Sequence, residues 1–185
     1  MPTRRDFLRQ SSLLTASFFV CKEEWFAAPK NIGLQLYTLR NEMEKDAKGT
    51  LAKVAAQGYK TVETYGYDTG KWFGMTVAEL KTTLKANGLS TPSGHTFPAS
   101  IFLQSGWEEK WKPAVTDAKA LGQDFIVIPW LEEQYRTPAD NYKKIAAALN
   151  QAGEICKNTG IKLAYHNHDF ELEPVAGTTG FSSKS

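Results

Sequence analysis

The sequence has little cysteine, little histidine and no long run of apolar residues. It holds 2 cysteines and 3 histidines in 185 residues, so a disulfide-stapled scaffold is excluded. No uninterrupted apolar run reaches the roughly 20 residues that span a bilayer. Basic and acidic residues nearly balance at 22 against 20, so the chain has no strong positive electrostatic field that would indicate nucleic acid as a partner. With 42% hydrophobic and 23% charged residues, the composition is that of a globular protein.

Residues 1–28 have the layout of an export signal. The paired Arg4 and Arg5 precede a moderately apolar stretch at 11–21, an arrangement typical of twin-arginine signals. It predicts a periplasmic or secreted protein, the alternative being an amphipathic first helix on a cytoplasmic one. Charged and bulky residues stand where a cleavage site belongs, so retention as a membrane anchor is a second outcome. Cys156 lies in a helical pattern, which predicts a core packing residue.

From residue 31 onward, short apolar runs alternate with helical patterns at a period of roughly 30 residues, which is typical of βαβ units and a parallel sheet. The predicted fold class is therefore α/β, of the (β/α)₈ TIM-barrel type. A complete barrel needs about 250 residues, so we expect an incomplete one at 29–185, with 175–185 as a polar tail. Strands are predicted at 32–36, 61–63, 89–93, 125–128 and 161–165, and four helices at 47–56, between a Thr76–Glu79 capping box and Gly88, at 107–121 and at 140–157.

All three histidines follow predicted strands, where a parallel sheet places its ligand site. His95 follows the third strand, and His166 and His168 follow the fifth. On an extended strand the last two point to the same face, so they could share a divalent cation, or one could bind the metal while the other holds substrate. Carboxylates from neighbouring strand ends, such as Glu132 or Glu63, could supply further ligands. The alternative is that they hydrogen-bond a sugar hydroxyl or pack in a polar barrel mouth.

Three glutamates near strand ends are candidate acid–base groups, namely Glu63, Glu132 and Glu171. A carboxyl group buried at a barrel mouth can have its pKa raised toward neutrality, although a solvated loop glutamate is the commoner outcome. Glu133 follows Glu132 directly, and the sequence does not separate the two. No glycine-rich phosphate loop and no Ser-His-Asp or Cys-His arrangement is present, so nothing here indicates a phosphorylated substrate.

Four segments together resemble the sugar phosphate isomerase/epimerase family of xylose isomerase-like TIM barrels. They are residues 32–40, 58–63, 93–95 and 160–171, the last being the most specific. The resemblance implies isomerisation or epimerisation of a small sugar or keto-sugar through an enediolate. It also implies a divalent metal ion, Mn²⁺, Mg²⁺, Zn²⁺ or Co²⁺, which would stabilise the developing oxyanion.

The resemblance also assigns roles to residues. It makes Glu63 and His95 substrate-side groups and places His166 and His168 where metal and substrate meet, with Glu171 just beyond. Together with the residue patterns above, we expect His166 and His168 as metal ligands, Glu63, His95 and Asn167 as substrate-binding groups, and Glu132 and Glu171 as catalytic carboxylates.

The family's later strands, which supply most of its metal ligands, have no counterpart before the polar tail. We therefore expect a chain truncated at its C-terminus and inactive alone, which leaves open whether it is an enzyme. One alternative is a keto-sugar lyase or dehydratase of the same fold. Another is a non-catalytic carbohydrate-binding fragment or a half-barrel that forms a homodimer.

Overall fold

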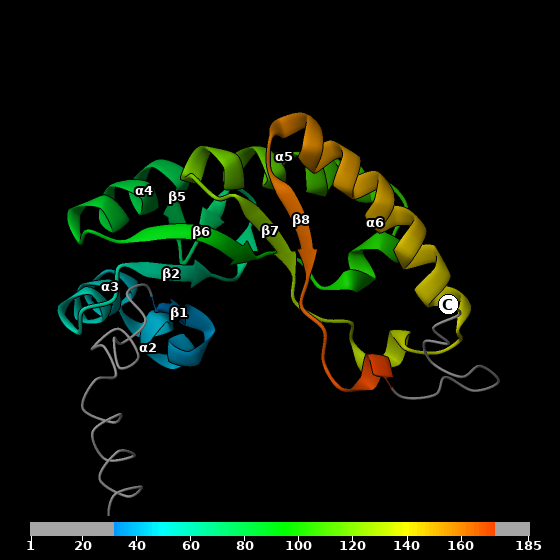
Figure 1. The fold of residues 1–185 in the computed structure, drawn as a ribbon, viewed down its shortest axis with the longest axis horizontal. Helices are drawn as coiled ribbons and strands as arrows, with labels where there is room; N and C mark the ends of the chain where they lie inside the picture. Colours follow the sequence, from blue (N-terminus) through cyan, green and yellow to red (C-terminus); the bar gives the residue numbers. More distant parts are fainter. Residues whose placement is uncertain (1–31, 173–185) are drawn as a thin grey trace, which may run out of the picture. The chain divides into compact units, whose positions relative to one another are not determined.

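A parallel sheet of five strands organises the residues that the computed structural model describes, 32–172. The strands lie side by side in chain order (Figure 1), and every neighbouring pair is parallel. This arrangement confirms the α/β class and a partial TIM-barrel sheet. The strands are β1 (Gly33–Gln35), β2 (Thr61–Thr64), β6 (Ser90–His95), β7 (Phe125–Ile128) and β8 (Lys162–Tyr165).

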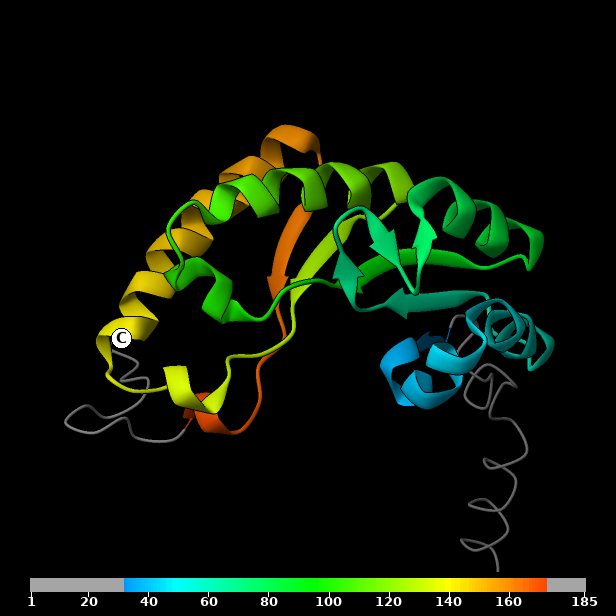
Figure 2. The same cartoon turned by 180° about the vertical axis from the view of Figure 1, so that it is seen from behind.

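Helices connect these strands, and α4 (Val77–Ala86), α5 (Trp107–Leu121) and α6 (Asp140–Thr159) lie along one side of the sheet in both views (Figures 1 and 2). Two of the predicted helices have the predicted bounds, and the capping box is present, with the Glu79 carboxylate accepting from the Thr76 backbone N–H at 2.8 Å. None of the described helices is long and apolar enough to cross a membrane. The helices are α2 (Arg40–Lys45), α3 (Ala47–Ala56), α4 (Val77–Ala86), α5 (Trp107–Leu121) and α6 (Asp140–Thr159).

A small antiparallel sheet between β2 and α4 was not predicted. It consists of β3 (Tyr67–Asp68), β4 (Lys71–Trp72) and β5 (Met75–Thr76). Strands of this length carry no alternating pattern that a sequence could reveal. Helix α2 was not predicted either, because its six residues are too few to show a helical period.

The strand β6 extends further than predicted because its backbone accommodates Pro92. Pairing with β2 runs from Thr61 opposite Ser90 to Glu63 opposite Ser93, so β6 holds one extra residue in that interval. Such a bulge lets a proline, which has no N–H to donate, stand in a strand with neighbours on both sides. The strand then continues through His95.

Helices cover one face of the sheet and leave the other face open, and polar side chains of the site lie on the open face. On the helix-covered face Ile126 and Ile128 are fully buried, whereas Phe125, which alternates with them, is 39% exposed on the opposite face. Strand periodicity and register place Glu63 and Ser93 on that opposite, open face. Cys156 is buried, which confirms its packing role.

Candidate functional site

The histidines, predicted at separate strand ends, lie together at the carboxyl end of the sheet. The ring centroids of His95 and His166 are 5.2 Å apart and the rings are nearly perpendicular. His166 and His168 have centroids 4.9 Å apart. The His166 N–H donates to the Ile128 carbonyl at 2.9 Å, so the chain beyond β8 stays aligned with β7.

Glu63 is the most extensively bonded acid of this cluster. Its Oε1 accepts from Gln35 Nε2 at 2.6 Å and lies 3.2 Å from His95 Nε2. Its Oε2 accepts from Ser93 Oγ at 2.5 Å. Burial alone raises the pKa of Glu63, but the hydrogen bonds from His95, Ser93 and Gln35 outweigh it and lower the pKa below its usual value. Glu63 is therefore an anion that holds His95 in place.

Glu171 and Asn167 are engaged within their own loop. Glu171 accepts from the Tyr165 hydroxyl at 2.6 Å and from the His168 backbone N–H at 2.7 Å. Burial, and then the bond to Glu171, raise the pKa of Tyr165, so its hydroxyl stays a donor at neutral pH. Asn167 is exposed, and its amide is 3.4 Å from the His168 carbonyl. Both oxygens of Glu171 thus stabilise the turn that carries His168.

Glu132 lies in a different place. Its Oε1 accepts from Ser100 Oγ at 2.6 Å, and within residues 32–172 its buried Oε2 has no hydrogen-bond partner. It lines a cavity of about 840 Å³ with residues such as Tyr67 and Asp117. The lining of this cavity includes neither Glu63 nor any histidine. Glu133, its neighbour, opens the short 3₁₀ helix η4 (Glu133–Tyr135).

The expected metal ligands are near one another, but their geometry differs from the expectation. The strand β8 ends at Tyr165, so His166 and His168 belong to the following loop rather than to one face of a strand. In the described part of the chain, no three His, Cys, Asp or Glu side chains form a group suited to a metal ion. Side chains between residues 32 and 172 therefore do not by themselves fit the implied metal.

Gln35 and Ser93 belong to the site although the sequence did not point to them. A polar residue in a short strand is common, and only the register places Gln35 and Ser93 on either side of Glu63. The one available signal was that Gln35 stands between Leu34 and Leu36 in its strand, whereas Ser93, between Pro92 and Gly94, shows no such alternation.

Arg136 was missed as well. Its guanidinium carbon lies 3.5 Å from the Phe170 ring centroid, and Phe170 stacks on His168. Arg136 therefore ties the loop after β7 to the turn that carries His168.

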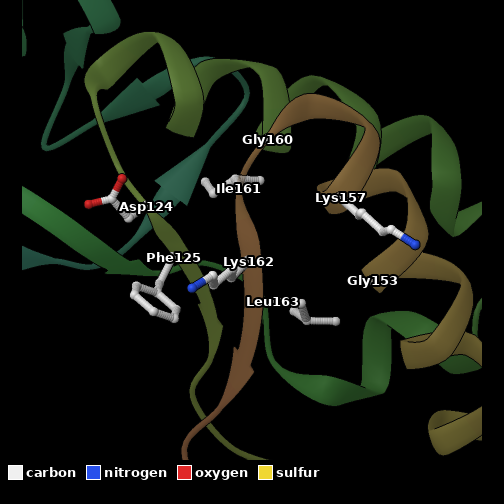
Figure 3. A pocket seen from close by; sticks show the side chains of 8 residues that line it. All are labelled: Asp124, Phe125, Gly153, Lys157, Gly160, Ile161, Lys162 and Leu163. Carbon is white, nitrogen blue, oxygen red and sulfur yellow. The ribbon is translucent and has the colours of Figure 1, made fainter.

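A second hollow, of about 830 Å³, lies beside β8 at the other end of the strands (Figure 3). Asp124, Phe125 and Lys162 line it where β7 and β8 begin, and Lys157 contributes from the last turns of α6. Lys162 Nζ is 5.4 Å from the centre of the Phe125 ring. Because parallel sheets bind ligands beyond the carboxyl ends of their strands, this hollow is not part of the histidine site.

Residues 51–180 match the family described as xylose isomerase-like TIM barrel. Two solved sugar phosphate isomerase/epimerase structures from Parabacteroides distasonis are similar at 28% and 30% identity, each with a TM-score of 0.67. The similarity covers 80% and 86% of this chain but 58% and 59% of those chains.

This chain therefore spans less than two thirds of the length of those relatives. A xylose isomerase-like TIM barrel protein from Mycobacterium smegmatis, in complex with magnesium, has a TM-score of 0.50 at 13% identity, over 66% of this chain and 46% of that one. At that identity the likeness concerns the fold. No curated protein matches the chain.

Proposed function

Because the chain belongs to the xylose isomerase-like TIM barrel family, we propose that it isomerises or epimerises a small sugar or keto-sugar through an enediolate. This proposal replaces the expectation that the chain is inactive alone, because the residues to which the proton transfer is assigned, Glu63, His95 and His166, all lie within the described residues. The observation that carries the proposal is the hydrogen-bonded pair of Glu63 and His95 at the carboxyl end of the sheet, with the His166 ring against His95. The sugar phosphate isomerase/epimerase structures that it resembles support the same chemistry.

In the proposed reaction, His95 accepts the proton from the carbon next to the substrate carbonyl. The electrons of that C–H bond form the carbon–carbon double bond of the enediolate, and the carbonyl oxygen takes the negative charge. The Glu63 carboxylate stabilises the resulting imidazolium, and His166 donates a hydrogen bond to the oxyanion. For isomerisation, His95 returns the proton to the former carbonyl carbon while the proton of the adjacent hydroxyl moves to the oxyanion oxygen. For epimerisation, solvent delivers a proton to the other face of the same carbon and His95 releases its own proton to solvent. General-base catalysis of this kind contributes roughly 10²–10⁴-fold.

The geometry favours His95 over the two glutamates predicted from the sequence as catalytic. Both carboxylate oxygens of Glu171 accept hydrogen bonds from its own turn. Glu132 lines the other cavity. Their predicted roles can be tested with the Glu132→Gln and Glu171→Gln variants beside those of the pair.

A divalent metal ion on His166 and His168 is also part of the proposal, on the ground of the family to which the chain belongs. Bound there, a cation would stabilise the oxyanion as a Lewis acid. The described side chains do not complete such a site, so the proton transfer above is assigned to the protein's own residues.

Deuterium exchange tests the function. The chain is incubated in D₂O with a panel of pentoses and hexoses, aldoses and ketoses, with and without Mn²⁺, and NMR follows the label. We expect incorporation at the carbon next to the carbonyl, lowered by roughly 100-fold in His95→Gln. Ser90→Ala is the control, since the Ser90 hydroxyl bonds the Lys60 carbonyl at the other end of β6.

Absence of exchange with every sugar, or equal exchange in His95→Gln, would refute the proposal. Loss of water from the sugar, or cleavage of its carbon chain, would identify a dehydratase or lyase instead.

We also propose that two copies of the chain associate. Among residues 32–172, β1 pairs only with β2 and β8 only with β7, and unpaired strand edges favour association. Light scattering after size exclusion is expected to give twice the mass of 20.6 kDa. A monomer at micromolar concentration would contradict this.

Export through a twin-arginine signal is proposed for the N-terminus, which lies outside the described residues. Fusing residues 1–31 to a reporter should send the reporter to the periplasm. Replacing both Arg4 and Arg5 by lysine should keep it in the cytoplasm. Equal export of the two fusions would refute the twin-arginine assignment.

A further inference from the structure

We infer that Gln35 and Ser93 are positioning residues that hold the Glu63 carboxylate so that His95 carries its proton on Nε2 and offers Nδ1 to the substrate. The inference rests on the proposed function, because it names the nitrogen that takes the substrate proton. It concerns four side chains on three adjacent strands, β1, β2 and β6.

Both oxygens of Glu63 are fixed from opposite sides. Gln35 donates to Oε1 from β1, and Ser93 donates to Oε2 from β6. A carboxylate free to rotate about its last bond could present either oxygen, or neither, to His95. With two short, charge-assisted hydrogen bonds, it presents Oε1 to His95 Nε2 at 3.2 Å.

The Gln35 amide cannot turn around without losing a second contact. Its Oε1 accepts from the Tyr37 backbone N–H at 2.8 Å, capping the short 3₁₀ helix η2 (Leu36–Leu39). That bond identifies the oxygen end of the amide, so the NH₂ end faces Glu63. Gln35 is therefore a donor to the carboxylate, as the 2.6 Å separation requires.

The fixed Glu63 carboxylate determines which ring nitrogen of His95 carries the proton. An ionised carboxylate only accepts hydrogen bonds, so the imidazole nitrogen that faces it must carry a proton. In the neutral ring the other nitrogen, Nδ1, is then the basic one. The side chains of His95 and Glu63 are only 14% and 27% exposed, so little water competes for this contact.

Nitrogen-15 NMR of the histidine rings tests the inference, using the full 185-residue chain at one fixed pH above neutrality. The shifts distinguish a protonated ring nitrogen from an unprotonated one, and His95→Gln assigns the His95 signals. We expect the Nε2–H tautomer in the wild type. Ser93→Ala and Gln35→Met should each raise the Nδ1–H fraction at least about twofold, Ser93→Thr should restore the wild-type ratio, and Ser90→Ala should leave it unchanged.

The deuterium-exchange assay supplies the second readout. A positioning role predicts that Ser93→Ala lowers kcat about tenfold, while KM changes less than about twofold, because the lost interaction matters mainly in the transition state. A purely structural role would instead reduce the amount of folded protein and leave the tautomer of the folded fraction unchanged.

The outcomes separate the two claims. Finding Nδ1–H in the wild type, a measurement that needs no variant to fold, overturns the inference. An unchanged tautomer ratio in both folded variants also overturns it. The expected tautomers without deuterium exchange in any sugar refute the proposed function and leave the effect of Ser93 and Gln35 on His95 standing.

Discussion

Gly94 lies between Ser93 and His95, and its lack of a side chain can be tested directly. A Cβ atom there would fall within 3.0 Å of Thr64 Oγ1 and Gln123 Nε2, closer than real Cβ contacts come. Those two atoms are hydrogen-bonded at 2.8 Å. We therefore expect Gly94→Ala to separate Thr64 from Gln123 and to lower the stability of the protein.

The size of the effect follows from burial. Thr64 and Gln123 are 0% and 1% exposed, so neither can turn to water. Overpacking a filled interior costs about 1–3 kcal/mol, and leaving a buried polar group unpaired costs about 1–3 kcal/mol. Because the two costs overlap, we expect a loss of roughly 2–4 kcal/mol in the free energy of unfolding. At about 2–4 °C per kcal/mol for a chain of this size, Tm should fall by roughly 5–15 °C.

Circular dichroism during heating and urea titration would measure this change. Gly33→Ala is the matched control, since its Cβ would meet only Thr61, at an ordinary 3.6 Å. Adding Thr64→Ala to Gly94→Ala removes one of the crowded atoms and should recover part of the loss. A Tm for Gly94→Ala within about 1 °C of that of Gly33→Ala would refute the packing argument.

Three further predictions concern titration and buried contacts. Because the pKa of Glu63 in the folded protein is lowered from 4.5, its ionisation stabilises the fold above that pH. The stability advantage of the wild type over Glu63→Gln, measured by urea titration, should therefore shrink as the pH falls below 4.5. A difference that stays constant with pH would contradict this. Burial raises the pKa of Cys156 to about 11, so in a Cys21→Ser background a thiol reagent at pH 8 should label the folded protein far more slowly than the urea-unfolded one; equal rates would contradict the burial. Tyr67→Phe removes the 2.7 Å bond to Asp117 and should cost about 1–2 kcal/mol in urea titrations, whereas no change would show that water replaces the hydroxyl.

Much of the fold was predictable because it depends on local patterns. Helix α3 and strand β7 have the bounds that their apolar spacing predicted, and Thr76 and Glu79 form the expected capping box. Such features involve residues a few positions apart, so the sequence contains them whole. The unpredicted sheet at 67–76 has strands too short for a period, and turns at glycines with positive φ connect them.

The site was predictable in outline only. That the three histidines would share the carboxyl end of the sheet followed from their places after strands. The sequence did not predict that Glu132 lines a separate cavity or that Glu63 contacts His95. These placements depend on residues far apart along the chain. Loops after successive strands can turn toward or away from the barrel axis without any change in the local sequence pattern.

The sequence by itself determined the α/β alternation, the family resemblance and the strand ends at which to look for a site. Tertiary structure alone decided which polar side chains meet there. The contacts of Glu63 with Gln35 and Ser93 join residues 28 and 30 positions apart, and they exist because parallel pairing brings these strands into register. Local propensity governs where a strand forms, whereas hydrogen bonding between strands governs which residue each side chain faces.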